Sequence, residues 1–299
     1  MVVVTTACLA ALTACIPIQA TVPPATAGSI VSEQVNLAQP VVFISTPAFT
    51  FAPAQTQLSQ GYLGPQQTVL SDWSPDGRHL LFWTGPVGAS VQADGLSLYV
   101  LDVATKQATL LADVALLNPH YHSWAADSSA LAFTAGGYRS AQVNKWLDVY
   151  NVASGQVTTA ISQSKQIPGM VAWSPRSDWI AYAAVLASAT GPEWADWMTF
   201  SNPAIAGRRI YLLQPATGEQ RRLNTIEAFQ DAPLWNEDGS LLYYVQQAGS
   251  DVVLMAADPV TGEATVVEAS RQPLPERAGF YGQGEWDILL NYRSRSSQQ

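Results

Sequence analysis

The sequence predicts an all-β protein, a β-propeller of four-stranded blades that occupies residues 40–299 as one domain. Three observations lead to this prediction. A tryptophan-marked β-hairpin occurs five times, at intervals of 51, 49, 62 and 51 residues. Further apolar runs follow each of the first four copies, so that each repeated unit contains four predicted strands. A second kind of turn recurs in these units at a similar distance after the tryptophan. A period of about fifty residues with four strands per unit is typical of the blades of a β-propeller. The marking residues are Trp73, Trp124, Trp173, Trp235 and Trp286.

The clearest copy of the hairpin spans residues 72–82. Pro75 presets φ at about −65° for the first central position of the turn, and Gly77 takes the position that needs a positive φ. Trp73 before the turn and the apolar residues 80–82 after it supply the flanks of a β-hairpin. Altered copies lie at residues 122–128, 171–177, 233–239 and, in part, 284–287.

The second kind of turn connects the third and fourth strands of a unit, at residues 102–106, 151–155, 214–218 and 258–262. A meandering β-sandwich is the alternative fold, but its evenly spaced strands give no reason for two kinds of turn to recur in step. The strands at 241–245 and 252–255 are almost continuously apolar. Such runs are expected where neighbours cover both faces of a sheet.

The composition bounds the class of protein. Charged residues make up 12% of the 299 residues and hydrophobic residues 48%, so the chain can bury a sizeable core. The formal net charge is −9, and the 14 lysine and arginine residues are scattered. Because nucleic-acid binding needs clustered Lys and Arg, we expect no nucleic-acid partner.

The N-terminal residues resemble an export signal. Residues 1–15 are apolar and rich in small side chains, but too short for a bilayer span, which needs about 20 residues. The run Leu12-Thr13-Ala14-Cys15 resembles the bacterial lipobox. This resemblance implies a signal peptide over residues 1–14 and lipidation of Cys15. The protein would then be anchored to the outer face of the cytoplasmic membrane or the periplasmic side of the outer membrane. A buried first strand with ordinary cysteines is the alternative.

The segment after the signal predicts a tether and then strands. Residues 15–39 are polar or small with a single charge, which indicates a flexible tether. Residues 40–45 and 49–51 are two short apolar runs, whereas the fifth unit has at most two strands, over 285–292. Because a closed ring leaves no free sheet edge, we expect the N-terminal strands to complete a fifth blade. Six blades, with an irregular N-terminal one, is the alternative.

The irregular loops predict where a partner binds. In an up-and-down blade the two short turns share one face, and the longer loops share the other. We expect binding on the loop-rich face. The longest loop, residues 186–207, can form a short helix from Pro192. Two roles for it stay open: it plugs the central channel, or it forms an aromatic platform for a sugar, peptide or protein. The candidate binding residues are Trp194, Trp197, Phe200, Tyr138, Trp146, Glu193 and Asp196.

Motifs for chemistry are sparse. The sequence contains no Gly-x-Ser-x-Gly elbow and no glycine-rich phosphate loop. Several loop carboxylates could reach one face, but their spacing selects no catalytic pair. His120 and His122 lie two residues apart on a strand and could begin a metal site, although ordinary partly buried histidines are the alternative. The sequence therefore predicts no catalytic residue, no cofactor and no bound metal.

The hairpin at 73–77, its copies at 173–175 and 235–239, and the strands at 98–102 and 210–214 resemble the TolB-like propeller repeat. The same repeat builds the N-terminal propellers of dipeptidyl peptidases and prolyl oligopeptidases. The resemblance covers about residues 66–293. It implies an envelope protein that acts as a non-enzymatic scaffold for a protein, peptide or glycan. The alternatives are a carbohydrate-active hydrolase or lyase with carboxylates on the loop-rich face, and a sensor domain.

Overall fold

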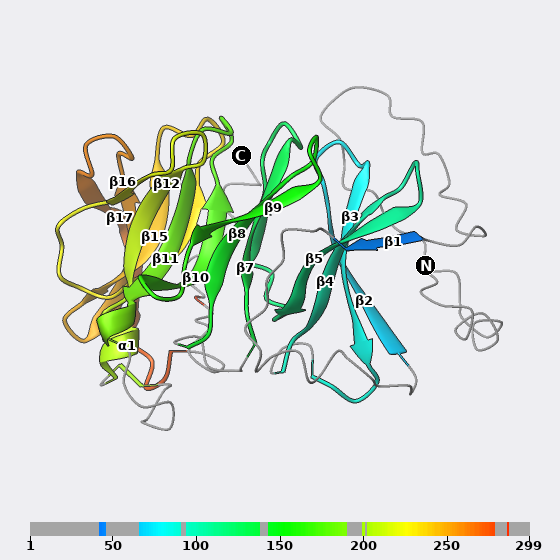
Figure 1. The fold of residues 1–299 in the computed structure, drawn as a ribbon. Helices are drawn as coiled ribbons and strands as arrows, with labels where there is room; N and C mark the ends of the chain where they lie inside the picture. The colour runs from blue at the N-terminus through cyan, green and yellow to red at the C-terminus, as the bar shows by residue number, and fades with distance from the viewer. Residues whose placement is uncertain are drawn as a thin grey trace.

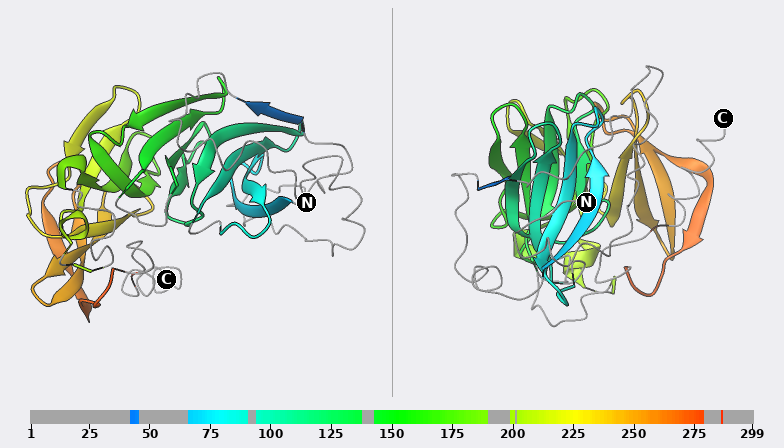
Figure 2. Two further views of the ribbon diagram at one scale, coloured as in Figure 1. Left: turned by 60° about the horizontal axis from the view of Figure 1, so that its bottom comes forward. Right: turned by 90° about the vertical axis from the view of Figure 1, so that its right-hand side faces the viewer.

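The computed structural model of the chain describes residues 42–45, 66–90, 94–137, 143–189, 199–200, 202–278 and 286. The described strands form four sheets, each a blade of four consecutive antiparallel strands, and the first blade carries one additional strand (Figure 1). The blades follow one another along an arc, from the cyan strands to the orange ones (Figure 2). The predicted all-β propeller of four-stranded blades is confirmed. A number of five blades stays a prediction.

The strands have the following bounds. Blade 1 contains β2 (Gln66–Trp73), β3 (His79–Pro86), β4 (Leu96–Asp102) and β5 (Gln107–Ala115). Blade 2 contains β6 (His122–Trp124), β7 (Ala130–Ala135), β8 (Trp146–Asn151) and β9 (Gln156–Ile161). Blade 3 contains β10 (Gln166–Trp173), β11 (Ile180–Leu186), β12 (Arg209–Gln214) and β13 (Glu219–Arg222). Blade 4 contains β14 (Gln230–Trp235), β15 (Leu242–Ala248), β16 (Asp251–Ala257) and β17 (Ala264–Pro273).

Short helices and irregular segments make up the remainder of the described chain. A 3-10 turn (Ala187–Ala189) follows β11, and the helix α1 (Pro203–Ala206) precedes β12. Asn202 caps α1, because its side chain accepts a hydrogen bond from the Ala204 N–H at 2.9 Å. No helix in the described ranges is both long and apolar enough to cross a bilayer.

The Pro-Asp-Gly turn forms as predicted. Gly77 has φ +71°, and its N–H donates to the Ser74 carbonyl at 2.9 Å. Blades 2 and 3 place Ser128 and Ser177 at the same position, with φ of +61° and +59°. Their hydroxyls explain why serine is kept there in spite of the backbone strain. Ser128 Oγ accepts the Asp76 N–H of blade 1 at 3.0 Å, and Ser177 Oγ accepts the N–H of the matching Asp in blade 2 at 3.4 Å. The turns of consecutive blades are therefore linked to one another.

The marking tryptophans occupy the steps between blades. Trp124 packs in a core cluster that joins blades 1 and 2, and Trp173 packs in the cluster that joins blades 2 and 3. Trp235 packs against the cluster between blades 3 and 4. Trp286 contacts the other face of blade 4, and Trp73 packs against a cluster of blade 1 residues. Trp124, Trp173 and Trp235 thus bind each of blades 2, 3 and 4 to the blade before it.

The N-terminal strand does not pair as predicted. The strand β1 (Val42–Ser45) runs parallel to β5, with Val42 opposite Gln107 and Ser45 opposite Leu110. The expectation that this strand completes a fifth blade beside residues 285–292 is therefore wrong for β1. The physical reason is that β5 is the outer edge of blade 1, and its unpaired backbone groups accept a further strand. The predicted second strand at 49–51, the tether and the signal peptide with Cys15 lie outside the described residues.

Candidate functional site

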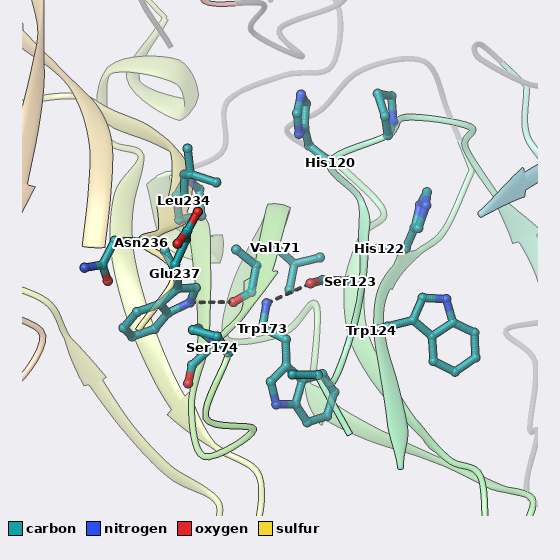
Figure 3. A pocket seen from close by; sticks show the side chains of 16 residues that line it. His120, His122, Ser123, Trp124, Val171, Trp173, Ser174, Leu234, Asn236 and Glu237 are labelled. Carbon is teal, nitrogen blue, oxygen red and sulfur yellow. Dashed lines mark hydrogen bonds between the residues drawn. The ribbon is translucent and has the colours of Figure 1, made fainter. Parts of the chain in front are cut away.

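A cavity of about 460 Å³ lies among the innermost strands of three blades (Figure 3). Its walls come from β6, β10 and β14 together with the residues that flank them. Each of these is the first strand of its blade and lies at one edge of its sheet. In Figure 3 the β14 side contributes Leu234 and Glu237, β10 contributes Val171 at the centre, and the β6 side contributes His120 and Ser123.

Hydrogen bonds between inner strands hold these walls together. The Val171 N–H donates to the His120 carbonyl at 2.8 Å, and the Trp173 N–H donates to Ser123 Oγ at 2.8 Å. On the other side, the Trp235 indole N–H donates to the carbonyl of Ala172 at 3.0 Å. Two of the strands also contain a β-bulge shortly before the tryptophan, which bends the strand locally. The edge groups of β10 are thereby satisfied, and the three strands form a continuous wall.

Several polar side chains of the wall are already engaged. Ser174 Oγ donates to Asp178, and the Asn236 side chain donates to Asp238 and Ser240 inside its own turn. The indoles of Trp124 and Trp173 are buried in the blade interfaces. Both side chains line the cavity, but with little exposed surface.

Two further groups of side chains line the cavity. Leu234 and Trp235 are half-buried apolar side chains on the β14 side, and Glu237 beside them is exposed. His120 and Ser123 are half-buried on the β6 side. The cavity therefore offers a mixed surface, in which polar groups are at least as prominent as apolar ones.

His122 belongs to the packing between blades 1 and 2. Burial, followed by the nearby charge of His120, lowers the pKa of His122 from 6.5 to about 4. The ring is therefore neutral at pH 7, and its Nε2 lies 3.8 Å from Asp72 Oδ2 without forming an ion pair. It meets the Trp83 ring edge-on, with centroids 5.7 Å apart. Within the described part of the chain, no three His, Cys, Asp or Glu side chains are grouped as metal ligands.

A second polar group, which we call the axial cluster, consists of Tyr121, Arg208, Phe229, Asp231 and Trp286. Arg208 Nη1 and Asp231 Oδ2 lie 2.8 Å apart, with side chains only 5% and 0% exposed. The Trp286 indole N–H donates to the same carboxylate oxygen at 3.4 Å, and the guanidinium lies over the Phe229 ring. Burial raises the pKa of Tyr121, whose hydroxyl has no hydrogen-bond partner among the described residues. Segments from blades 2, 3 and 4 and from the fifth repeat thus meet at one ion pair.

The described part of the longest loop packs against the axial cluster. Phe200 meets Phe229 edge-on, with centroids 5.0 Å apart, and lies 6.3 Å from the Trp286 ring. Ile205 of α1 is fully buried in the same apolar group. The described end of the loop is therefore part of the packed interior, and both predicted roles of the whole loop stay predictions. The other candidates from this loop, Glu193, Trp194, Asp196 and Trp197, lie outside the described residues, as does Tyr138.

Trp146, the remaining candidate, packs against the core of blades 1 and 2. Its indole N–H donates to Asp148 Oδ2 at 2.8 Å. Sequence reasoning did not single out Arg208 or Glu237, and it counted Asp231 among the loop carboxylates, whereas the structure buries it in β14. For Asp231 a signal existed, since a lone carboxylate inside an apolar first strand requires a buried counter-charge.

Asp148 gives the fold a measurable pH dependence. Burial raises the pKa of Asp148 from 3.8 to about 6, against opposing hydrogen bonds from Thr159 and Trp146. A carboxyl with a higher pKa in the folded state binds its proton more tightly there. Its contribution to stability is therefore full below about pH 4 and is lost as the pH rises to about 6. A pKa difference of about two corresponds to up to about 3 kcal/mol.

We expect Asp148→Asn to raise the free energy of unfolding at pH 7 by up to about 3 kcal/mol, because the amide accepts the Trp146 bond without a buried charge. The gain disappears near pH 4. Urea unfolding at both pH values measures it, with the exposed Glu219→Gln as the control for loss of one charge. An equal gain at the two pH values would contradict the prediction.

Comparisons with known proteins give structural neighbours of low sequence identity. TolB from Acinetobacter baumannii aligns with a TM-score of 0.42 and 16% identity, over 67% of this chain and 43% of that one. Dipeptidyl peptidase 4 from Porphyromonas gingivalis aligns with a TM-score of 0.49 and 12% identity, over 68% of this chain and 32% of that one. Oligogalacturonate lyase from Vibrio parahaemolyticus aligns with a TM-score of 0.40 and 16% identity, over 68% of this chain and 64% of that one.

TolB and dipeptidyl peptidase 4 are β-propeller proteins, and at these identities the similarity concerns the fold alone. The chain spans less than two thirds of the length of each of the three structures. The sequence matches no protein-family model and none of the curated proteins.

Proposed function

We propose that this chain is an exported, lipid-anchored β-propeller that binds an extended peptide segment of a partner protein, without catalysis, in the cavity between β6, β10 and β14. The observation that carries the proposal is the cavity itself. Its volume of about 460 Å³ lies in the range of about 300–1,000 Å³ that is typical of ligand sites. Three inner strands with fixed lateral hydrogen bonds form its walls, so the site is preorganised.

The wall chemistry favours a peptide over a glycan. A sugar is held by exposed aromatic faces and by polar side chains with free hydrogen-bonding groups. Here the indoles of Trp124 and Trp173 are buried, and the Ser174 and Asn236 side chains are bonded within their own turns. Aliphatic and proline side chains lie beside polar groups in the lining, a mixture that suits the backbone and the apolar side chains of a peptide.

A carbohydrate-active enzyme is the competing function. Glycoside hydrolysis uses two carboxyl groups about 5–10 Å apart. Among the described residues of the lining, Glu237 is the one carboxylate. Release of shortened or unsaturated products from oligogalacturonates or other oligosaccharides by the purified protein would favour the enzyme over the binding role.

The lipid anchor is proposed from Leu12-Thr13-Ala14-Cys15. Two or three acyl chains, at about 0.8 kcal/mol per buried methylene, hold a protein firmly on a membrane. Labelled palmitate should enter the parent protein and not Cys15→Ser. Equal labelling of the two would refute the anchor.

We expect a random heptapeptide library to yield binders that lose at least about tenfold in affinity when Ala126 is replaced by tryptophan. Ala126 is exposed and lines the cavity, so the larger side chain narrows the site without disturbing the core. Isothermal titration of the selected peptides against both proteins measures the loss.

The matched control is Ala153→Trp, which adds the same bulk to an exposed turn outside the cavity lining. It should bind the peptides as the parent does. Failure to select any peptide, or equal binding by Ala126→Trp, would overturn the proposed function.

A further inference from the structure

We infer that the bound peptide carries a lysine or arginine side chain that lies between Glu237 and Trp235, an inference that rests on the proposed peptide-binding role. The argument uses the charge of the cavity lining, the place of Glu237 in the hairpin repeat, and the exposure of the Trp235 indole.

The charged side chain of the cavity lining is acidic. Among the described residues that line the cavity, Glu237 is the one acidic side chain and none is Lys or Arg. The carboxylate is exposed and makes no hydrogen bond or ion pair with other described residues. A carboxylate in an otherwise uncharged and partly apolar pocket favours a cationic ligand group. The net charge of −9 also attracts basic segments at long range.

The hairpin itself does not need the charge of Glu237. Aligned on the tryptophans, Glu237 takes the position held by Pro75, Ala126 and Pro175 in the other blades. The next residue of its turn, Asp238, makes the bonds that close the turn, to Ser240 N–H at 2.8 Å and to the Asn236 amide at 2.8 Å. Ala126 and Pro175 line the same cavity, so blade 4 alone among the three walls presents a carboxylate there.

Trp235 provides the second half of the site. Its indole N–H is bound to the Ala172 carbonyl, which fixes the plane of the ring, and the half-buried side chain still lines the cavity. An indole face attracts a cation at exposed sites. An exposed ion pair adds a further, modest attraction. Together they correspond to a preference of roughly tenfold for a basic over a neutral side chain.

The experiment repeats the heptapeptide selection on the parent and on Glu237→Gln, and counts Lys and Arg in the selected sequences. We expect clear enrichment on the parent and little on Glu237→Gln. Glu219→Gln, which removes an exposed carboxylate outside the cavity lining, should keep the enrichment. Titration of one selected peptide and its Arg→Gln or Lys→Gln form should show a difference of roughly tenfold, which shrinks in 0.5 M salt.

The outcomes separate the two proposals. Selected peptides without basic enrichment, or with equal enrichment on Glu237→Gln, would overturn this inference and leave the peptide-binding role in place. A selection that returns no peptide would overturn both. Because Glu237 is exposed and makes no bond in its turn, Glu237→Gln is expected to fold as the parent does, and a thermal melt checks this.

Discussion

Replacing Asp231 by alanine lowers the free energy of unfolding by about 3–5 kcal/mol, because the Arg208 guanidinium stays buried without its counter-charge. The two side chains lie 2.8 Å apart and are almost completely shielded from water. The Asp231→Ala substitution also removes the carboxylate that accepts the Trp286 indole N–H. Since the pair joins blade 3 to blade 4, we expect the whole described domain to lose stability, as measured by urea unfolding.

A surface pair of the same length provides the matched control. Arg271 and Asp251 also lie 2.8 Å apart, but their side chains are 62% and 25% exposed. Asp251→Ala should therefore change the free energy of unfolding by less than about 1 kcal/mol. The double variant Arg208→Met, Asp231→Leu should recover most of the loss, since apolar replacement of a buried pair is often neutral. Equal losses for Asp231→Ala and Asp251→Ala would contradict the prediction.

Replacing Trp173 by alanine lowers the free energy of unfolding by about 3–5 kcal/mol, the usual range for the loss of a buried aromatic side chain. The indole is 8% exposed and lies in the core cluster that contains residues of both blade 2 and blade 3. Removing it leaves a cavity at the joint between two sheets, and rigid strands on both sides prevent the gap from collapsing. Thermal and urea unfolding measure the loss.

Trp73 is the natural comparison, since it holds the same position in the hairpin of blade 1. It is half-buried and packs against residues of its own blade. Trp73→Ala should therefore cost roughly half as much as Trp173→Ala, in proportion to the smaller apolar area buried. If the two variants were equally destabilised, the indoles would not act as joints between blades.

The cavity lies in a different place from the binding face that the sequence predicts. The sequence predicts binding on the loop-rich face, yet the described cavity runs along the inner strands to the turn residues Ala126, Pro175 and Glu237. The described end of the long loop, with Phe200 and α1, packs against the axial cluster. The aromatic platform of Trp194 and Trp197 stays a prediction. The heptapeptide selection addresses the cavity independently of that loop.

The four-stranded blades could be predicted from short stretches of sequence. Pro75 and Gly77 have the torsion preferences that a tight turn requires, and the apolar runs have the length of strands, so each hairpin is encoded within a few residues. The recurrence of Trp73, Trp124 and their counterparts at a regular interval then indicates repeated units.

Contacts between distant segments were decided only by the tertiary structure. No local pattern states that Val42–Ser45 pairs with β5, or that Arg208 meets Asp231 from the next blade. The neutral state of His122 and the solvent-facing position of Glu237 in the cavity depend on what surrounds them. The physical reason is that turn and strand preferences act over a few residues, whereas burial, ion pairing and cavity shape depend on how whole blades pack together.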